Sequence, residues 1–140
     1  MISEISMKNI LAEVEVSSAR PLEEMARELS AVIGGISFER EETGRFEEVP
    51  AFVARDNKSG MAFILFGIPE GETCDAYTLE CYAETRLSIS EFSRNLFGLM
   101  SNVLVEKNIN VRGYFDYSDE FASALTANGI SANARCEGQV

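Results

Sequence analysis

Hydrophobic and polar residues alternate with a period of two in two stretches of the chain, 10–16 and 77–84. This period places successive side chains on opposite faces of a strand, so it predicts strands with one buried and one solvated face. Three shorter apolar runs, 36–39, 49–55 and 61–68, lie between the two alternating stretches. We expect these runs to pair as a meander of antiparallel strands whose sheet is buried on one side.

The segments that join the three runs also carry structural signals. DNKSG predicts a tight turn, because Asn57 and Gly60 tolerate positive φ and Asp56 can accept a hydrogen bond from its own backbone. EETGRFEE connects the first two runs. Pairing across EETGRFEE would direct Phe38 and Phe52 into the core.

Apolar residues recur every three or four positions in three other stretches, which is the spacing of an amphipathic helix. The first predicted helix starts at Pro21, which suits a first helical turn, and stops at Gly34-Gly35. The second starts at Ser88, which can form a capping box with Glu91, and we expect it to be the longest helix and the main cover of the sheet. Its apolar stripe consists of Ile89, Phe92, Leu96, Phe97, Met100, Val103 and Leu104.

The last third of the chain predicts a short helix between two further strands. The strands are expected at 109–117 and 130–136, with Ser118 as the N-cap of the helix and Asn128-Gly129 as its end. Because the chain has no linker and no repeat, residues 1–140 are predicted to form a single binding domain. The predicted fold class is α+β: a single-layer, mainly antiparallel sheet packed on one long and one or two shorter helices.

The net charge narrows the range of partners that this domain can bind. The chain has 23 acidic and 12 basic residues and no histidine, which gives a formal charge of −11 at pH 7. Such a surface repels phosphate backbones and anionic membranes, so we expect neither nucleic-acid nor membrane binding. It attracts a basic protein partner, although acidity can also serve solubility alone.

The sequence also predicts where the protein acts. Its longest apolar run, 61–69, has the length of a strand and falls far short of the roughly 20 residues that a membrane helix needs. The N-terminal MISEISMKN lacks the basic start and apolar stretch of a signal peptide. Three cysteines without a CxxC pair fit a reducing compartment, so we expect a cytoplasmic location.

Candidate catalytic chemistry is sparse in this sequence. Without histidine the chain lacks the most common acid-base group, and its three lysines lie in polar or terminal contexts. The acidic pairs Glu80 with Glu84 and Glu47 with Glu48 are explained more simply as solvated positions than as a glycosidase pair. DNKSG lacks the ligand pattern of a calcium loop, and the Gly-Gly pair closes a helix instead of cradling a phosphate. We therefore expect no enzyme activity, no cofactor and no metal.

Two groups of acidic residues beside aromatic ones are the candidate contacts for a basic partner. The first lies within FEREETGRFEEVPAF, where the acids outnumber the arginines that could offset them, so their crowding costs stability. The second lies within YFDYSDE, whose aromatic residues are of the type found at interface centres. The first group consists of Glu39, Glu41, Glu42, Phe46, Glu47 and Glu48, and the second of Tyr114, Asp116, Tyr117, Asp119 and Glu120. A solvated, merely tolerated loop is the alternative interpretation of the first group.

The chain is a compact, acidic α+β chain without a catalytic set, and it contains the segments RFEEVPAFVA, MAFILFGIP and FDYSDEFASALTANGI. In these respects it resembles the small immunity proteins of bacterial contact-dependent growth inhibition and other polymorphic toxin systems. The resemblance implies a cytoplasmic protein that binds a cognate toxin domain, often a basic nuclease. It also implies neutralisation by covering the toxin's active or substrate-binding surface, with the acids replacing the toxin's phosphate contacts.

Two other functions fit the same sequence. Type III secretion chaperones are similar in length, acidity and α+β composition, and a homodimer would favour that function, whereas a monomer with one acidic face would favour immunity. A small ligand-binding housekeeping domain, with a pocket between the long helix and the sheet, is the third alternative.

Overall fold

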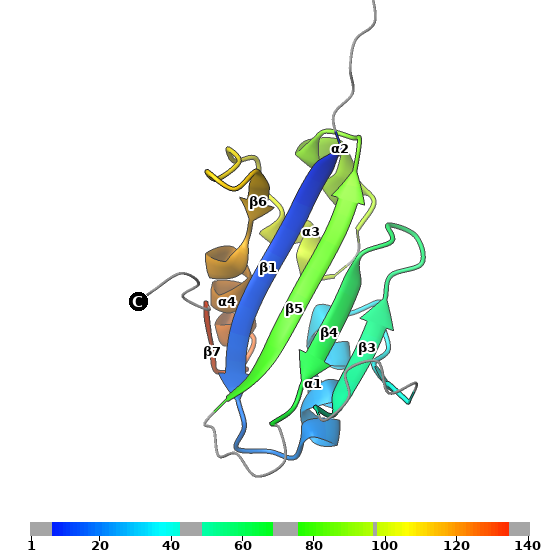
Figure 1. The fold of residues 1–140 in the computed structure, drawn as a ribbon, viewed down its shortest axis with the longest axis vertical. Helices are drawn as coiled ribbons and strands as arrows, with labels where there is room; N and C mark the ends of the chain where they lie inside the picture. The colour runs from blue at the N-terminus through cyan, green and yellow to red at the C-terminus, as the bar shows by residue number, and fades with distance from the viewer. Residues whose placement is uncertain (1–6, 43–48, 69–75, 97, 135–140) are drawn as a thin grey trace, which may run out of the picture.

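The chain folds into one open sheet with helices on one of its faces (Figure 1). The computed structural model describes residues 7–42, 49–68, 76–96 and 98–134. Within these residues the strands are β1 (Lys8–Ser17), β2 (Glu39–Arg40), β3 (Ala51–Arg55), β4 (Ala62–Phe66), β5 (Ala76–Thr85), β6 (Tyr114–Asp116) and β7 (Ala132–Ala134). The helices are α1 (Leu22–Ile33), α2 (Ile89–Arg94), α3 (Met100–Val103) and α4 (Ser118–Ala127). The predicted α+β class is confirmed.

The strands follow the order β2-β3-β4-β5-β1-β6, and β7 also pairs with β1. All ladders are antiparallel except β1 with β6, which is parallel. The predicted turn between β3 and β4 is confirmed: the Asp56 carboxylate accepts the backbone N–H of Ser59 at 3.2 Å, and Gly60 has a φ of 82°. β1 therefore lies between the meander β2 to β5 on one side and the short strands β6 and β7 on the other.

The core lies between the sheet and the helices. The predicted buried faces are confirmed in β1 (Ile10, Ala12, Val14 and Val16) and in β5 (Tyr77, Leu79, Cys81 and Ala83). From the helix side, α1 contributes Met25, Ala26, Leu29 and Ile33, and α4 contributes Phe121, Ala122 and Leu125. Burial also raises the pKa of the Cys81 thiol, which keeps this cysteine protonated and unreactive.

The prediction of a long helix from Ser88 is wrong, because α1, with 12 residues, is the longest helix within the described chain. The capping box of Ser88 and Glu91 does form and lowers the pKa of the Glu91 carboxyl, but α2 already ends at Arg94. The helical path is interrupted at Gly98, whose φ is +67°. This conformation lets the N–H of Leu99 donate to the last carbonyl of α1, Ile33 O, at 3.0 Å. Tertiary hydrogen bonding therefore overrides the helical periodicity.

The side chains expected under that helix nevertheless reach the core. Phe92, Leu96 and Met100 are buried, as predicted, and Phe97 lies outside the described residues. A further hydrogen bond, from Ser93 Oγ to Ser101 O at 3.0 Å, ties α2 to α3 across the break. Two short helices cover the area that one long helix was expected to cover.

The predictions for the last third of the chain are confirmed in part. Of the expected strand 109–117, only β6 forms, and the expected edge strand 130–136 is present as β7, with residues 135 and 136 outside the described chain. Ser118 is not the N-cap; that position is Tyr117. The Ser118 hydroxyl instead accepts the N–H of Glu13 on β1 at 2.9 Å and donates to Asp116 Oδ1 at 2.6 Å. The serine therefore joins α4 to the sheet.

Candidate functional site

The helices leave one face of the sheet uncovered, here called the open face (Figure 1). Strand alternation assigns it every second residue, and apart from the buried Ala51 these side chains are half-buried or exposed, in contrast to their neighbours in the core. Its residues are Leu11, Glu13 and Glu15 of β1, Val53 and Arg55 of β3, Ala62, Ile64 and Phe66 of β4, and Thr78, Glu80, Tyr82 and Glu84 of β5.

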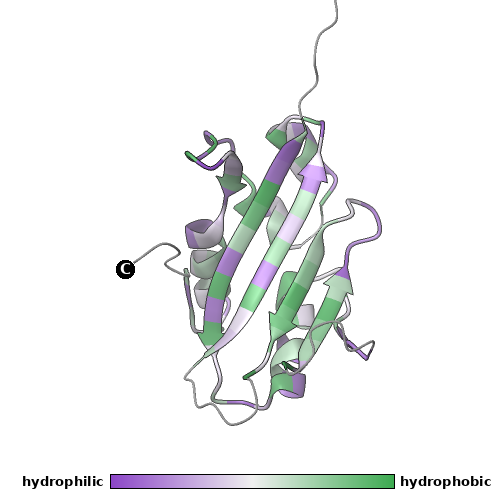
Figure 2. Cartoon of the chain, in the orientation of Figure 1, coloured by the Kyte–Doolittle hydropathy of each residue, from purple (hydrophilic) through white to green (hydrophobic). Residues whose placement is uncertain are grey.

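The open face has an apolar half and an acidic half. Figure 2 shows hydrophobic residues along β3 and β4 and alternating polar and apolar residues along β5 and β1. The strand register joins the halves, because Val53 is opposite Ile64, Ile64 is opposite Glu80, and Glu80 is opposite Glu13. A partner that binds flat on the open face would therefore contact aliphatic side chains and carboxylates within one patch.

Two carboxylates face each other in the acidic half. Glu13 and Glu80 are direct cross-strand partners, and such side chains have Cβ atoms about 4.5–5.5 Å apart. Like charges in this position destabilise a sheet. Glu15 follows on the same face of β1, opposite Thr78. The acids thus concentrate negative charge in the middle of the open face.

Replacing Glu13 by glutamine is expected to raise the free energy of unfolding by about 0.2–1 kcal/mol, because it removes the repulsion from Glu80 and keeps the shape of the side chain. Urea denaturation followed by circular dichroism measures the change. Glu15→Gln is the matched control, since its direct partner is Thr78. An equal or larger gain in the control would contradict electrostatic conflict between Glu13 and Glu80.

Two tyrosines lie at one end of the open face. The Tyr82 hydroxyl is 2.7 Å from Glu84 Oε2 and 2.9 Å from Asn9 Oδ1, and hydrogen bonding to Glu84 raises the pKa of Tyr82 to about 12. Tyr114 is aligned with Asn9 through the parallel register of β6 with β1, and the Arg112 guanidinium lies 5.9 Å from its ring centroid. These rings offer apolar area with a polar tip, as interface tyrosines do.

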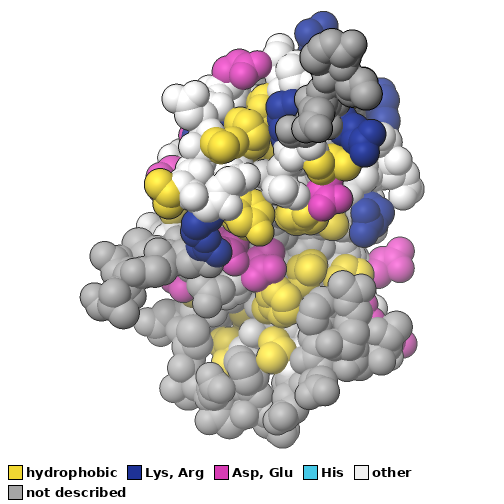
Figure 3. Space-filling model, turned by 45° about the horizontal axis from the view of Figure 1, so that its top comes forward, with side chains coloured by type: hydrophobic (Ala, Val, Ile, Leu, Met, Phe, Trp, Pro, Cys, Tyr) yellow, Lys and Arg dark blue, Asp and Glu magenta, His cyan; other side chains and the backbone are white. Residues whose placement is uncertain are grey.

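Basic side chains gather at the same end of the molecule (Figure 3). Lys8 begins β1, Arg86 directly follows β5, and Arg112 precedes β6. Acidic side chains lie further along the open face.

The described members of the first predicted acidic group lie on and after β2, at the opposite edge of the sheet from Tyr114 on β6. Glu39 and Glu42 are exposed and Glu41 is half-buried. Glu39 is opposite Val53, so it extends the row of open-face residues to the β2 edge. The other members, Phe46, Glu47 and Glu48, lie outside the described residues.

The second predicted group is largely engaged within the protein. Asp116 Oδ1 accepts the N–H of Ser118 at 2.9 Å, and Glu120 forms an ion pair with Lys107 at 2.8 Å. The ion pair with Lys107 offsets the charge of Glu120, and Lys107 Nζ also donates to the backbone carbonyl of Asp116 at 2.6 Å. Asp119, by contrast, is exposed.

The predicted interface role of Tyr117 needs correction. Its side chain is fully buried, and its hydroxyl donates to Val105 O at 2.6 Å. Burial also raises the pKa of Tyr117 to about 12. Because a side chain with no exposed area cannot contact a partner, Tyr117 serves the core.

The structure therefore does not join the described members of the two predicted groups: Glu39 is on β2, at one edge of the sheet, and Tyr114 and Asp116 are on β6, at the other. It places other acids between them: Glu13, Glu15 and Glu80. Alternation alone identifies these residues as solvated. Their proximity depends on the pairing of β1 with β5, which the alternation does not encode.

Within the described residues, neither a metal-ligating cluster nor a sizeable cavity under the helices, beside Ile33 and Met100, is found. No group of three or more metal-ligating acidic or cysteine side chains occurs among them. The cavity where the helices meet the sheet has a volume of about 10 Å³, which is about the least that holds one water. This cavity is too small to be the ligand-binding pocket that the third alternative expects between helix and sheet.

No helix in the described parts of the chain combines the length and apolarity that a membrane span requires. No protein-family model, no curated protein and no solved structure matches the sequence. Function is therefore inferred from the geometry and charge of the open face.

Proposed function

We propose that this chain is an immunity protein of the contact-dependent or polymorphic toxin type, which acts in the cytoplasm by binding and neutralising a cognate basic toxin domain. The protein covers the active or substrate-binding surface of the toxin with its open face. The observation that carries this proposal is the direct opposition of Glu13 and Glu80 beside an exposed apolar surface.

The two halves of the open face suit two kinds of contact. Ile64 and Phe66 are half-buried aliphatic and aromatic side chains, whose further burial by a partner favours binding. The carboxylates of Glu13, Glu15 and Glu80 attract lysine and arginine and repel acidic proteins, which provides specificity and fast encounter. A cation placed between Glu13 and Glu80 is attracted to both carboxylates.

A nuclease-type toxin offers the complementary surface. Such a domain neutralises substrate phosphates with lysine and arginine side chains. Carboxylates two residues apart on one strand, such as Glu13 and Glu15, are spaced by about 7 Å and present a regular row of negative charge. A flat strand surface with such a row can occupy a phosphate-binding groove and exclude the nucleic acid.

The double variant Glu13→Lys with Glu80→Lys is expected to slow association with the toxin domain about tenfold at low salt, because it removes electrostatic steering. The difference should shrink at high salt, where the Debye length falls to about 3 Å at 1 M. Stopped-flow kinetics measures both rates. The partner to test is the toxin domain encoded beside this chain, and growth of cells that express this toxin reports neutralisation.

The matched control is Glu23→Lys with Glu24→Lys, which changes the net charge equally but lies on α1, on the covered side of the sheet. Equal slowing by the control would show that the open face is not the contact surface. Failure of the wild-type chain to bind the neighbouring domain or to rescue growth would refute the immunity function.

A further inference from the structure

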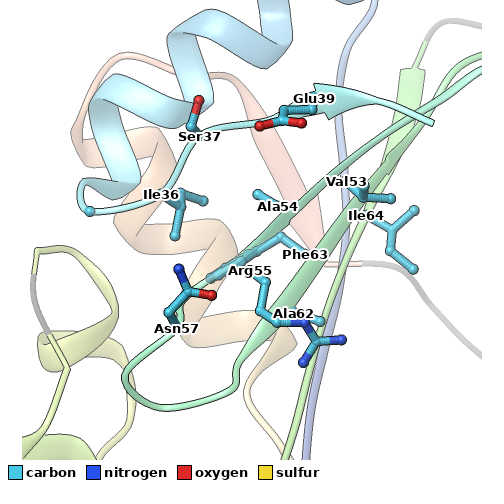
Figure 4. Close-up of a pocket in the computed structure, with 11 residues that line it drawn as sticks. Ile36, Ser37, Glu39, Val53, Ala54, Arg55, Asn57, Ala62, Phe63 and Ile64 are labelled. Carbon is cyan, nitrogen blue, oxygen red and sulfur yellow. The ribbon is translucent and has the colours of Figure 1, made fainter. Parts of the chain in front are cut away.

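A groove with a volume of about 730 Å³ opens at the β2 edge of the sheet (Figure 4). One wall is the segment 35–39, which follows α1, and the other wall consists of β3, its following turn and β4. The described side chains that line it include Ile36, Glu39, Val53, Arg55, Asn57 and Ile64. Val53 and Ile64 belong to the open face, so the groove is continuous with it.

The groove exists because the chain before β2 is held away from β3. The N–H of Phe38 donates to Ser30 Oγ on α1 at 3.1 Å. The Phe38 ring packs edge-on against Phe63, with ring centroids 6.4 Å apart. These contacts fix residues 36–38 to the helix and core, and β2 has only two residues. Among the described residues, the pairing of β3 with β2 therefore ends at Val53.

The backbone of β3 continues past this point with hydrogen-bonding groups directed into the groove. The N–H of Glu41 donates to Ala51 O at 2.9 Å, so backbone groups of Ala51 face β2. In an antiparallel ladder this direction recurs at every second residue, so it recurs at Val53, opposite Glu39, and at Arg55. The N–H and C=O of Arg55 thus face the groove, at a strand edge that can template another strand.

We propose that the groove binds an extended basic peptide segment, which adds to the edge of β3 as a further strand at Arg55. This proposal rests on the proposed function in one respect: the peptide segment belongs to the toxin domain. The mode is strand addition, in which backbone hydrogen bonds hold the peptide and side-chain contacts select it.

Charge and shape both select a basic segment. The Glu39 carboxylate lies on the wall of the groove and the chain carries a net charge of −11, so an acidic segment is repelled. Ile36, Val53 and Ile64 provide an apolar lining for the stem of a lysine or arginine. The guanidinium of Arg55 donates to Gly60 O at 3.0 Å and, as Figure 4 shows, points away from Glu39. The acidic wall is therefore accessible to a cation.

The test uses a capped, fluorescein-labelled peptide that alternates lysine and valine, with binding followed by fluorescence anisotropy and by the backbone amide NMR signals of the protein. The peptide is expected to bind and to shift the amide signals of Ala54, Arg55 and Asn57. Two further peptides are N-methylated at every second backbone amide, one at the odd and one at the even positions. One of the two should bind about two- to tenfold more weakly than the parent peptide, because its methyl groups remove the hydrogen bonds to β3. A peptide with glutamate in place of lysine should not bind.

Two protein variants separate backbone pairing from charge. Arg55→Pro removes the groove-facing N–H and leaves the ladder to β4 intact, since proline is tolerated on the free side of an edge strand. Arg55→Ala keeps the N–H. Both variants lack the Arg55 guanidinium, so they differ in the backbone N–H alone. The proline variant is expected to bind the peptide about two- to tenfold more weakly than the alanine variant.

Each outcome decides between strand addition and its alternatives. Absence of peptide binding at about 1 mM, or equal binding by both methylated peptides and the parent, overturns the proposal. Amide shifts confined to Glu13 and Glu80 would place the peptide on the open face and also overturn it. Peptide binding in the groove without any binding of the toxin domain would support strand addition and refute the immunity function.

Discussion

Replacing Tyr117 with alanine is expected to lower the free energy of unfolding by about 3–5 kcal/mol, the cost of removing a fully buried aromatic side chain. The ring fills the space between α4 and the segment that follows α3, and its hydroxyl donates to Val105 O. Lys107 Nζ lies 4.9 Å from the ring centroid. Alanine would remove all three interactions and leave a cavity.

Two controls identify the source of the Tyr117 effect. Tyr117→Phe keeps the ring and removes only the hydrogen bond to Val105 O, so it should cost about 0.5–1.5 kcal/mol, the net contribution of one hydrogen bond. Tyr114→Ala removes a half-buried ring from the open face and should cost less than Tyr117→Ala. Urea denaturation measures all three variants. Near-wild-type stability of Tyr117→Ala would return this residue to the candidate interface.

Alanine at Gly98 is expected to destabilise the fold by about 2–5 kcal/mol, the sum of a left-handed backbone conformation and a steric clash. Gly98 has a φ of +67°, and an added Cβ would lie 2.2 Å from Ile33 O. That oxygen accepts the N–H of Leu99 at 3.0 Å, so it cannot move away without breaking the contact between α1 and α3.

Gly129→Ala is the matched control for Gly98, because its φ is +91° and no atom lies within 4 Å of an added Cβ. It should cost about 1–2 kcal/mol from backbone conformation alone. The difference between the two variants in thermal and urea denaturation measures the clash with Ile33 O. Equal losses would show that the end of α1 yields to a methyl group, and that only the positive φ constrains Gly98.

Local patterns predict the parts of this fold that local interactions determine. Alternation locates the buried faces of β1 and β5, because a sheet covered on one side imposes a strict period of two on its strands. The Ser88 capping box and the Asp56 turn depend on residues close in sequence and are both present. The break at Gly98 depends on a hydrogen bond to Ile33, far earlier in the chain, which periodicity cannot reveal.

The candidate site was predicted less well for a related physical reason. Runs of charged residues in the sequence indicate sites in loops. The closely spaced acids of the open face come instead from two strands, and Glu13 and Glu80 are far apart in sequence. Tyr117 stands beside acidic residues in the sequence, which suggests an interface. Its N–H donates to Leu11 O at 2.8 Å, however, and this continuation of the β6 pairing leads the chain into α4 with the ring directed to the core.

The central position of β1 also fixes the order in which the protein can fold during synthesis. This strand leaves the ribosome first among the described elements, but all its partners, β5, β6 and β7, come later, and Val14 pairs with a residue as distant as Ala134. Pairing over such separations is slow, because the entropy of closing long loops is lost before the contacts form. The alternating apolar side chains of β1 therefore lack their sheet partners until β5 has been made, and the excess of acidic over basic residues helps the nascent chain to resist aggregation in the meantime.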